Sequence, residues 1–364
     1  MSIKAQSSVT PADRYVAMRL RAPLPDDAPA VLALLVARDI ADLGTPDHTL
    51  EDLLDDWREA EFSLTADALV VELDDTRIAG YGAVRRTGTL AVVAPELEGR
   101  GIGARVLQWA EQREREHGRA RHRQWIPAKN LRAQAMLRAA GYLPQRSCWR
   151  MVRPLGHFAQ ATAIPVGFAL RPLDVDHDAP GLHALDAASF AGNPGYEPES
   201  LAAFCDEHLD AHDLDPELSC VAQEGDTIAG FLLARRRQDE AVGYIDLLAV
   251  RPDRRRRGLG TSLLETAFAR FAAAGLREGG LDVDSDNPRA LRLYERAGMR
   301  PRFQLDTYER PSLAATSRRP GLPRPGGSNG ATVESSRSRT AAARSPGDGL
   351  ADPSTPGSRR CRRW

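Results

Sequence analysis

An internal repeat limits what this chain can fold into. The tripeptide Ile78–Gly80 recurs 150 positions later as Ile228–Gly230, and each is followed by an apolar stretch and a pair of arginines. Further along the chain the separation becomes 157 and stays there, for Val93 and Val250, Pro95 and Pro252, Gly101 and Gly258, Gly103 and Gly260, Asn130 and Asn287, and Gly141 and Gly298. A separation that stays fixed over many positions indicates a duplication. The sequence therefore predicts two copies of one fold, with extra residues near 238–245 in the second copy.

Hydrophobic periodicity and turn residues predict the same order of elements in both copies. For the second copy we expect a strand at 168–172 and two amphipathic helical segments at 179–190 and 198–209. A hairpin at 218–235 and a third strand at 242–250 follow. The copy ends with a helix at 258–274, a strand at 281–284, a helix at 288–297 and a closing strand pair at 299–308. The fold class is α/β (α+β), with two tandem domains that each hold a mixed central sheet of about six to seven strands flanked by helices.

The expected domain boundaries follow from the repeat and from composition. They are an N-terminal extension at 1–15, a first domain at 16–153, a linker at 154–167, a second domain at 168–310 and a tail at 311–364. Ser, Pro, Gly, Ala and Arg dominate the tail, which predicts a disordered basic segment. Contact of this tail with nucleic acid or an anionic surface is the alternative.

Overall composition indicates a globular protein, because 42% of the residues are hydrophobic and 27% are charged. A formal charge of -1 names no dominant partner, so nucleic acid is not expected as one. The apolar stretch 30–37 is too short to cross a bilayer, and the N-terminus lacks a signal-peptide pattern, so we expect a cytoplasmic protein without a membrane partner. The four cysteines form no C-x-x-C pair, which indicates ordinary thiols.

One segment of the second copy indicates a phosphate-bearing ligand. Residues 250–260 leave a predicted strand, pass through four arginines and open a predicted helix with Gly258 and Gly260. A helix N-terminus offers unpaired N–H groups to a phosphate, and arginines add charge-assisted hydrogen bonds. The dinucleotide fingerprint fails because Leu263 stands where a third small residue belongs, and the P-loop pattern is absent.

Through these residues and others downstream, the sequence resembles the GCN5-related N-acetyltransferases (GNAT). The family signature corresponds to Val250, Pro252, Arg255, Gly258 and Gly260, followed by Asn287, Ala290, Tyr294 and Gly298. The resemblance covers 168–310 well and 16–153 more loosely. The tandem arrangement and the segment 283–287 are similar to two-domain members such as mycothiol synthase.

The resemblance implies acetyl-CoA as the donor substrate, no metal, and a small-molecule or peptide amine as the acceptor. It assigns the cofactor to residues at the end of one strand, in the glycine loop and before the last helix, namely Leu248, Ala249, Val250, Arg255, Arg256, Arg257, Gly258, Leu259, Gly260, Thr261 and Asn287. It also assigns to Tyr294 the protonation of the leaving thiolate. Asp246, four residues before Val250, is the best candidate for the general base, directly or through water.

Each of these residues also has a structural alternative. Tyr294 could be a core tyrosine, Asp246 a solvated edge residue, and the arginine run a solvated basic patch. His208 and His212, four positions apart, could face one metal ion, but we expect exposed helix residues.

The two copies are not equivalent at the positions that carry chemistry. At the separation of 157, Arg255 corresponds to Glu98, Tyr294 to Leu137, and Asp246 to Thr89. We therefore expect the second copy to be catalytic and the first to be degenerate, a structural unit that completes the acceptor pocket or the domain interface. Arg100 and Arg105 leave open that the first copy still holds a cofactor.

The acceptor itself stays open at this point. In the family the helical segments after the first strand shape the acceptor pocket, which here means 187–215, with Asn193, Tyr196 and Glu197 among the polar groups. Two other functions remain as alternatives: a non-catalytic acyl-CoA sensor or interaction module, and a nucleic-acid-associated protein that depends on the basic tail. The resemblance does not decide the oligomeric state.

Overall fold

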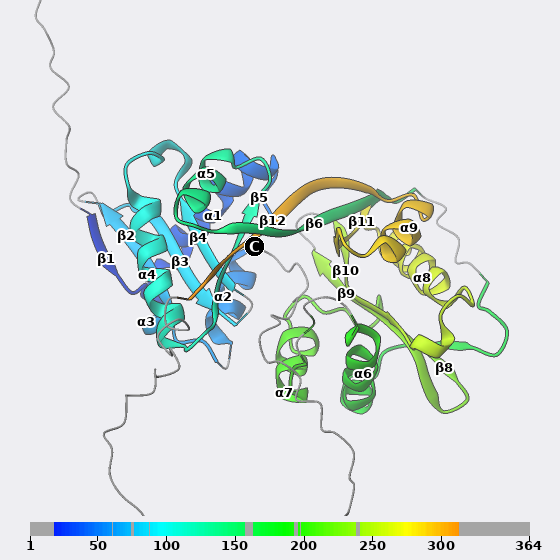
Figure 1. Cartoon of the computed structure of the whole chain (residues 1–364). Helices are drawn as coiled ribbons and strands as arrows, with labels where there is room; N and C mark the ends of the chain where they lie inside the picture. Colours follow the sequence, from blue (N-terminus) through cyan, green and yellow to red (C-terminus); the bar gives the residue numbers. More distant parts are fainter. Residues whose placement is uncertain are drawn as a thin grey trace, which may run out of the picture.

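The computed structural model describes residues 18–59, 61–73, 76–86, 88–156, 163–192, 196, 198–237 and 241–312 (Figure 1). The extension 1–15, residues 157–162 of the linker and the tail after Ser312 lie outside the described residues. The described strands form one twelve-stranded sheet in the order β1-β2-β3-β4-β5-β12-β6-β11-β10-β9-β8-β7.

Both copies build their strands in the same order, with helices at corresponding places except for the short α3 of the first copy, which confirms the mixed α/β fold. The first copy contains β1 (Met18–Arg21), α1 (Ala28–Leu43), α2 (Leu50–Arg58), α3 (Leu64–Asp67), β2 (Ala68–Leu73), β3 (Ile78–Arg85), β4 (Gly88–Val93), α4 (Ile102–Glu116), β5 (Arg121–Pro127), α5 (Leu131–Ala139) and β6 (Leu143–Pro154). The second contains β7 (Ala169–Arg171), α6 (Val175–Phe190), α7 (Leu201–Phe204), β8 (Cys220–Glu224), β9 (Thr227–Arg237), β10 (Val242–Val250), α8 (Leu259–Ala273), β11 (Glu278–Asp284), α9 (Pro288–Arg296) and β12 (Arg300–Pro311). No helix among the described residues has the length and apolar character needed to span a membrane.

Helices cover both faces of the second half of the sheet. On one face, Leu263 of α8 is fully buried in a cluster with Ile245 of β10. On the other face, Leu182 of α6 is fully buried in a cluster with Leu247 of the same strand. Successive strand residues face opposite sides of a sheet, so a strand covered on both faces is apolar along most of its length.

Backbone conformation confirms the separation of 157 found in the sequence. Left-handed residues occur in matched pairs at this separation: Gly99 (φ 75°) and Arg256 (φ 64°), Gly101 (81°) and Gly258 (83°), Gly118 (70°) and Gly275 (79°), and Gly141 (84°) and Gly298 (79°). Positive φ is costly for residues other than glycine, so matched positions show that the turns of the two copies have one geometry. Arg256 is the only residue of this set that is not a glycine, so it alone adopts this unfavourable conformation with a side chain.

The two copies exchange their last strands. β6 ends the first copy but pairs with β11 of the second, from Glu278–Pro154 to Asp284–Cys148. β12 ends the second copy but pairs with β5 of the first, from Leu305–Pro127 to Pro311–Arg121. β6 and β12 also pair with each other, and Figure 1 shows these two long strands running from one half of the molecule to the other.

The exchange corrects one expectation from the sequence. The predicted strand pair at 299–308 is a single strand, β12, whose neighbours on both sides belong to the first copy. Local sequence does not reveal this pairing, because strand propensity says which residues are extended and not which strand they join.

A buried arginine ties the exchanged strands together. Arg150 of β6 binds Asp47 of the first copy (Nη1–Oδ1 2.8 Å) and Asp282 of β11 (Nε–Oδ1 2.5 Å), and its side chain is only 6% exposed. Its guanidinium also lies over the rings of Tyr244, at 5.1 Å, and Phe303, at 4.9 Å. Burial alone would lower the pKa of Arg150, but Asp282 and Asp47 outweigh burial and raise it. One cation therefore connects four separate segments.

Replacing Arg150 with methionine should destabilise the protein by about 3–5 kcal/mol, because Asp47 and Asp282 would be left as buried charges without their partner. Urea unfolding of the full chain at neutral pH measures this free energy. The matched control is Arg146→Met on the same strand, whose partners Asp284 and Asp286 are 17% and 40% exposed, and which should cost less. Equal losses in the two variants would contradict this account of Arg150.

Candidate active site

A bulge in β10 positions the only acidic side chain of that strand. In the pairing with β9, Ile245 lies opposite Ala234 and Leu247 opposite Leu233, so Asp246 is an extra residue without a partner of its own. A bulge of this kind turns two consecutive side chains toward one face and strengthens the local twist. Asp246 consequently lies on the α6 side of the sheet together with Leu247.

The edge of β10 that faces β11 opens immediately after the bulge. The two parallel strands pair from Val242–Glu278 to Ile245–Leu281, and the paired register ends there. The N–H of Arg251 donates to the Ala229 carbonyl on the β9 side at 2.9 Å. Alternation along the strand then directs the N–H groups of Leu248 and Val250 toward the β11 side, where an extended chain with amide groups can bind.

Asp246 is held by an arginine and a histidine. Its carboxylate contacts His208 Nδ1, and its Oδ1 lies 3.3 Å from Arg235 Nε, while the same guanidinium binds Asp213 at 3.1 Å. Burial favours the neutral carboxyl, but Arg235 and then His208 outweigh burial and hold the pKa of Asp246 well below its ordinary value of 3.8. Asp246 is therefore an ionised group, and it orients the imidazole of His208.

His208 is the functional candidate that sequence reasoning missed. It lies in the π-helical turn Cys205–Leu209 after α7, with 2% of its side chain exposed and its ring 4.9 Å from that of Phe204. One of its nitrogens and carboxylate oxygens of Glu199 and Glu207 all lie within 4.8 Å of one another. The expectation of an exposed helix residue is wrong here, because the partner that buries His208 is 38 positions away.

His212 belongs to a different cluster. Its Nδ1 lies 2.6 Å from Asp55 of α2 in the first copy, and its Nε2 lies 3.9 Å from Asp52. The two histidines, although four positions apart, therefore do not face one shared metal ion.

The glycine loop has the geometry of an anion site. Arg256 (φ 64°) and Gly258 (φ 83°) turn the chain sharply, and α8 begins at Leu259. The first turn of a helix leaves its N–H groups without partners in the helix, which here come from Leu259, Gly260 and Thr261. The partial positive charge at the N-terminus of α8, a helix of 15 residues, adds to the attraction for a phosphate.

Arg255 supports this loop instead of extending from it. Its Nε donates to the Val250 carbonyl at 3.2 Å, and its Nη2 donates to the Ser189 carbonyl at 2.6 Å. Burial, followed by the nearby cation Arg289, lowers the pKa of Arg255. The side chain thus fastens the loop to the ends of β10 and α6.

Most of the arginine run is paired locally. Arg254 and Arg257 bind the two oxygens of Glu224 at 2.5 and 3.3 Å, and Arg257 also lies over the ring of Phe168 at 4.7 Å. Arg256 is exposed and makes no ion pair or side-chain hydrogen bond with the described residues. It is thus the arginine of this run best placed to meet a ligand phosphate.

The last helix contributes the two remaining predicted residues. Asn287 caps α9, with its side-chain oxygen accepting the Ala290 N–H at 3.2 Å. Tyr294, near the C-terminal end of α9, is 9% exposed and packs in one core cluster with residues of α8. A side chain placed on Gly260 would come within 3.6 Å of Leu293, so α9 lies directly beside the start of α8.

Comparison with known proteins identifies the family. The model of the acetyltransferase (GNAT) family matches residues 36–142 and again 182–299, once in each copy. The chain belongs to this family. Its members are N-acetyltransferases, so the protein is an enzyme of the acyltransferase class.

Similar proteins include mycothiol acetyltransferases and other members of the family. A mycothiol acetyltransferase of Thermobispora bispora is 31% identical over 60% of this chain and 74% of its own length, and one of Streptomyces bingchenggensis is 28% identical over 66% and 78%. Among solved structures, a GCN5-related N-acetyltransferase from Sphaerobacter thermophilus is 29% identical, with a TM-score of 0.68 over 84% of this chain and 97% of its own. A tandem GNAT protein from the clavulanic acid biosynthesis pathway has a TM-score of 0.66 at 16% identity, over 81% and 99%, and shows the shared fold.

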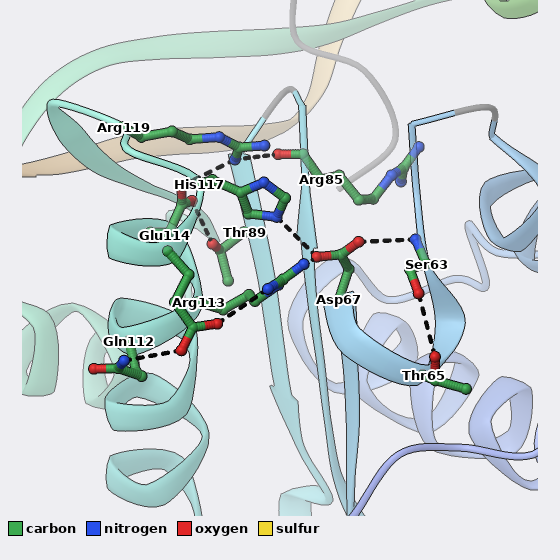
Figure 2. Close-up of polar contacts among 11 residues, drawn as sticks. Ser63, Thr65, Asp67, Arg85, Thr89, Gln112, Arg113, Glu114, His117 and Arg119 are labelled. Carbon is green, nitrogen blue, oxygen red and sulfur yellow. Dashed lines mark hydrogen bonds and ion pairs between the residues drawn. The ribbon is translucent and has the colours of Figure 1, made fainter.

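The first GNAT copy lacks the bulge, which corrects the correspondence of Asp246 with Thr89. In the first copy Val84 pairs with Thr89 and Ala83 with Leu90 without a break. Thr89 therefore matches Ile245 in structure, and Asp246 has no counterpart. Figure 2 shows the Thr89 hydroxyl donating to Glu114 of α4 at 2.9 Å.

The other chemical positions of the first GNAT copy are also occupied by structural contacts. Glu98, at the position of Arg255, forms ion pairs with Arg38 and, at 3.5 Å, with Arg132. Leu137, at the position of Tyr294, is 1% exposed in an apolar cluster. These residues maintain the fold of the first copy without supplying a proton donor.

Replacing Asp246 with asparagine should lower the free energy of unfolding at neutral pH and matter less in acid. Because the folded pKa lies below 3.8, the ionised carboxylate stabilises the protein fully above that pH, and this contribution is lost as the pH falls below it. Urea unfolding of wild type and Asp246→Asn from pH 7 to pH 3 measures the difference. A difference that stays constant over this range would contradict the ion-pair assignment.

Proposed function

We propose that this enzyme transfers the acetyl group of acetyl-CoA to a primary amine, and that the reaction takes place in the second copy. The observation that carries the proposal is the bulged Asp246, which lies at the start of the open edge of β10, ahead of the glycine loop along the chain, and has no counterpart in the first copy. The open edge, the glycine loop and the proton donor all lie within residues 246–294, while His208 comes from an earlier turn of the same copy.

The open edge of β10 and the glycine loop bind different parts of acetyl-CoA. The pyrophosphate binds the N–H groups from Arg256 to Thr261, with Arg256 as the arginine that meets it. The amide-bearing arm lies along Leu248, Ala249 and Val250, where strand-like hydrogen bonds hold it. The Leu248 N–H is directed to the same edge and stabilises the oxyanion that forms at the thioester carbon.

Three proton and bond changes complete the reaction. The amine nitrogen attacks the thioester carbonyl carbon, and the pair Asp246–His208 takes up the proton that the nitrogen loses. The tetrahedral intermediate collapses with cleavage of the carbon–sulfur bond. Tyr294 then gives its hydroxyl proton to the departing thiolate, as the resemblance to the family implies.

The acceptor side carries more negative than positive groups. Asp246, Glu199 and Glu207 face Arg235 and Arg86, and His208 lies among them. Such an arrangement favours an acceptor with an ammonium group. Asn193 and Glu197, which the sequence also suggested for this pocket, lie outside the described residues.

The cofactor site is tested by blocking each glycine loop in turn. Gly260→Trp should abolish acetyl-CoA binding, since the indole would fill the space beside Leu293 where the pyrophosphate approaches the helix start. Isothermal titration calorimetry of the full chain measures the affinity. Gly103→Trp, the matched position of the first copy, is the control, with thermal melts to confirm that both variants fold.

Loss of binding only in Gly260→Trp supports the second-copy site. Unchanged binding in that variant, with the loss in Gly103→Trp instead, would move the cofactor to the first copy and overturn the proposal.

Catalysis is tested by removing the two proton-transfer groups. Tyr294→Phe and Asp246→Asn should each lower kcat by about two orders of magnitude or more while acetyl-CoA still binds. Thiol release from acetyl-CoA measures the rate with a panel of primary amines, including the deacetylated precursor of mycothiol because relatives carry that name. Tyr142→Phe, the same change at a buried tyrosine of the first copy, is the control and should keep the rate.

Acetyl-CoA binding without turnover of any amine in the panel would indicate a non-catalytic acyl-CoA sensor. Full activity in Tyr294→Phe would remove that residue from the mechanism and leave the family assignment intact.

A further inference from the structure

A side chain of the first copy reaches the acceptor side of the second. Arg86 directly follows β3, and its Nη2 contacts Oε2 of Glu207 and lies 3.4 Å from Oε2 of Glu199. All three side chains are largely buried, with 25%, 17% and 12% exposed. One guanidinium nitrogen therefore bridges two carboxylates that belong to the other copy.

The two glutamates lie next to the catalytic pair. Glu207 and His208 are consecutive in the turn that follows α7, and the carboxylate of Glu199 is within 4.8 Å of both. His208 in turn contacts Asp246 on the bulge. The carboxylates that Arg86 holds thus lie within 4.8 Å of the histidine that contacts the proposed reaction centre.

Comparison of the two copies shows that the repeat counterpart of Arg86 does not make the same contacts. Arg86 corresponds to Arg236 at the separation of 150, and Arg236 binds Asp215 of its own copy at 2.7 Å. The duplicated arginine has therefore kept an intra-copy role in one half of the molecule and acquired an inter-copy role in the other.

Without Arg86, Glu199 and Glu207 would repel each other at this distance, and the segment that carries His208 would lose the ion pairs that Arg86 of the first copy makes with it. An arginine that can bind two carboxylates at once holds them side by side. The two carboxylates are thereby held beside His208.

We propose that Arg86 is a specificity-determining residue of the acceptor site: it fixes Glu199 and Glu207 so that they bind the ammonium group of the acceptor beside His208. This inference rests on the proposed function, and it gives the first copy a direct part in acceptor recognition. Arg86 is a positioning residue, because it acts through the two glutamates.

The test compares steady-state kinetics of full-length wild type, Arg86→Met and Arg86→Lys with the best amine of the panel. Arg86→Met should raise KM for the amine roughly tenfold and leave KM for acetyl-CoA unchanged, since it removes charge-assisted hydrogen bonds on the acceptor side only. Arg86→Lys should restore part of the affinity. Glu207→Gln combined with Arg86→Met should add little further loss, because the two groups act as one unit.

Two matched controls separate this role from general support of the interface. Asp55→Asn weakens another contact between the copies in this region, the one to His212, and Arg236→Met removes the repeat counterpart of Arg86. Both should leave KM for the amine unchanged. An equal rise of KM in Asp55→Asn, or an unchanged KM in Arg86→Met, would overturn the role of Arg86 while the acetyltransferase proposal stands.

Failure of the proposed function has a different signature. If wild type acetylates no amine in the panel, both the N-acetyltransferase proposal and the acceptor role of Arg86 are wrong. If wild type is active and only the Arg86 variants behave like wild type, only the present inference is wrong.

Discussion

The exchange of β6 and β12 is the constraint on which the rest of the structure depends. A GNAT copy that lends its last strand to its neighbour cannot complete its sheet alone, so the two copies share one continuous set of hydrogen bonds. Arg150 stabilises this junction only because Asp47 and Asp282 reach it from different copies. Buried ion pairs contribute little net stability but penalise wrong partners strongly, so the network favours one register of the exchanged strands.

Much of the fold could be predicted from the sequence, because duplication gives every element two independent signals. The turns at Gly99 and Arg256 have the same backbone conformation, although only one is a glycine, as the fixed separation of 157 implies. The strand exchange could not be predicted in this way. The residues of β12 have the same alternating pattern whether their neighbour is a strand of their own copy or of the other, so pairing is decided by tertiary contacts that leave no local trace.

Some parts of the site could likewise be predicted from local sequence, and others could not. The glycine loop and the start of α8 are local in sequence, and the structure places them as the motif predicts. The bulge is different: counting residues aligned Asp246 with Thr89, whereas the pairing of Thr89 with Val84 and of Ile245 with Ala234 shows that Asp246 is an insertion. His208 and Arg235, the partners of Asp246, come from other elements of the second copy, and Arg86 comes from the first copy. Such contacts are visible only once the chain is folded.

The difference between the copies follows from this single inserted residue more than from the substitutions around it. Without a bulge, strand residues alternate, and Thr89 turns to Glu114 of α4 on the face opposite to the acceptor side. A substitution of Thr89 by aspartate would therefore place a carboxylate against α4 and would not recreate the site. With the bulge, an acid lies beside the open edge of β10, and its charge requires Arg235 and His208. The first copy has no such insertion in β4; it keeps its sheet and supplies Arg86 across the interface.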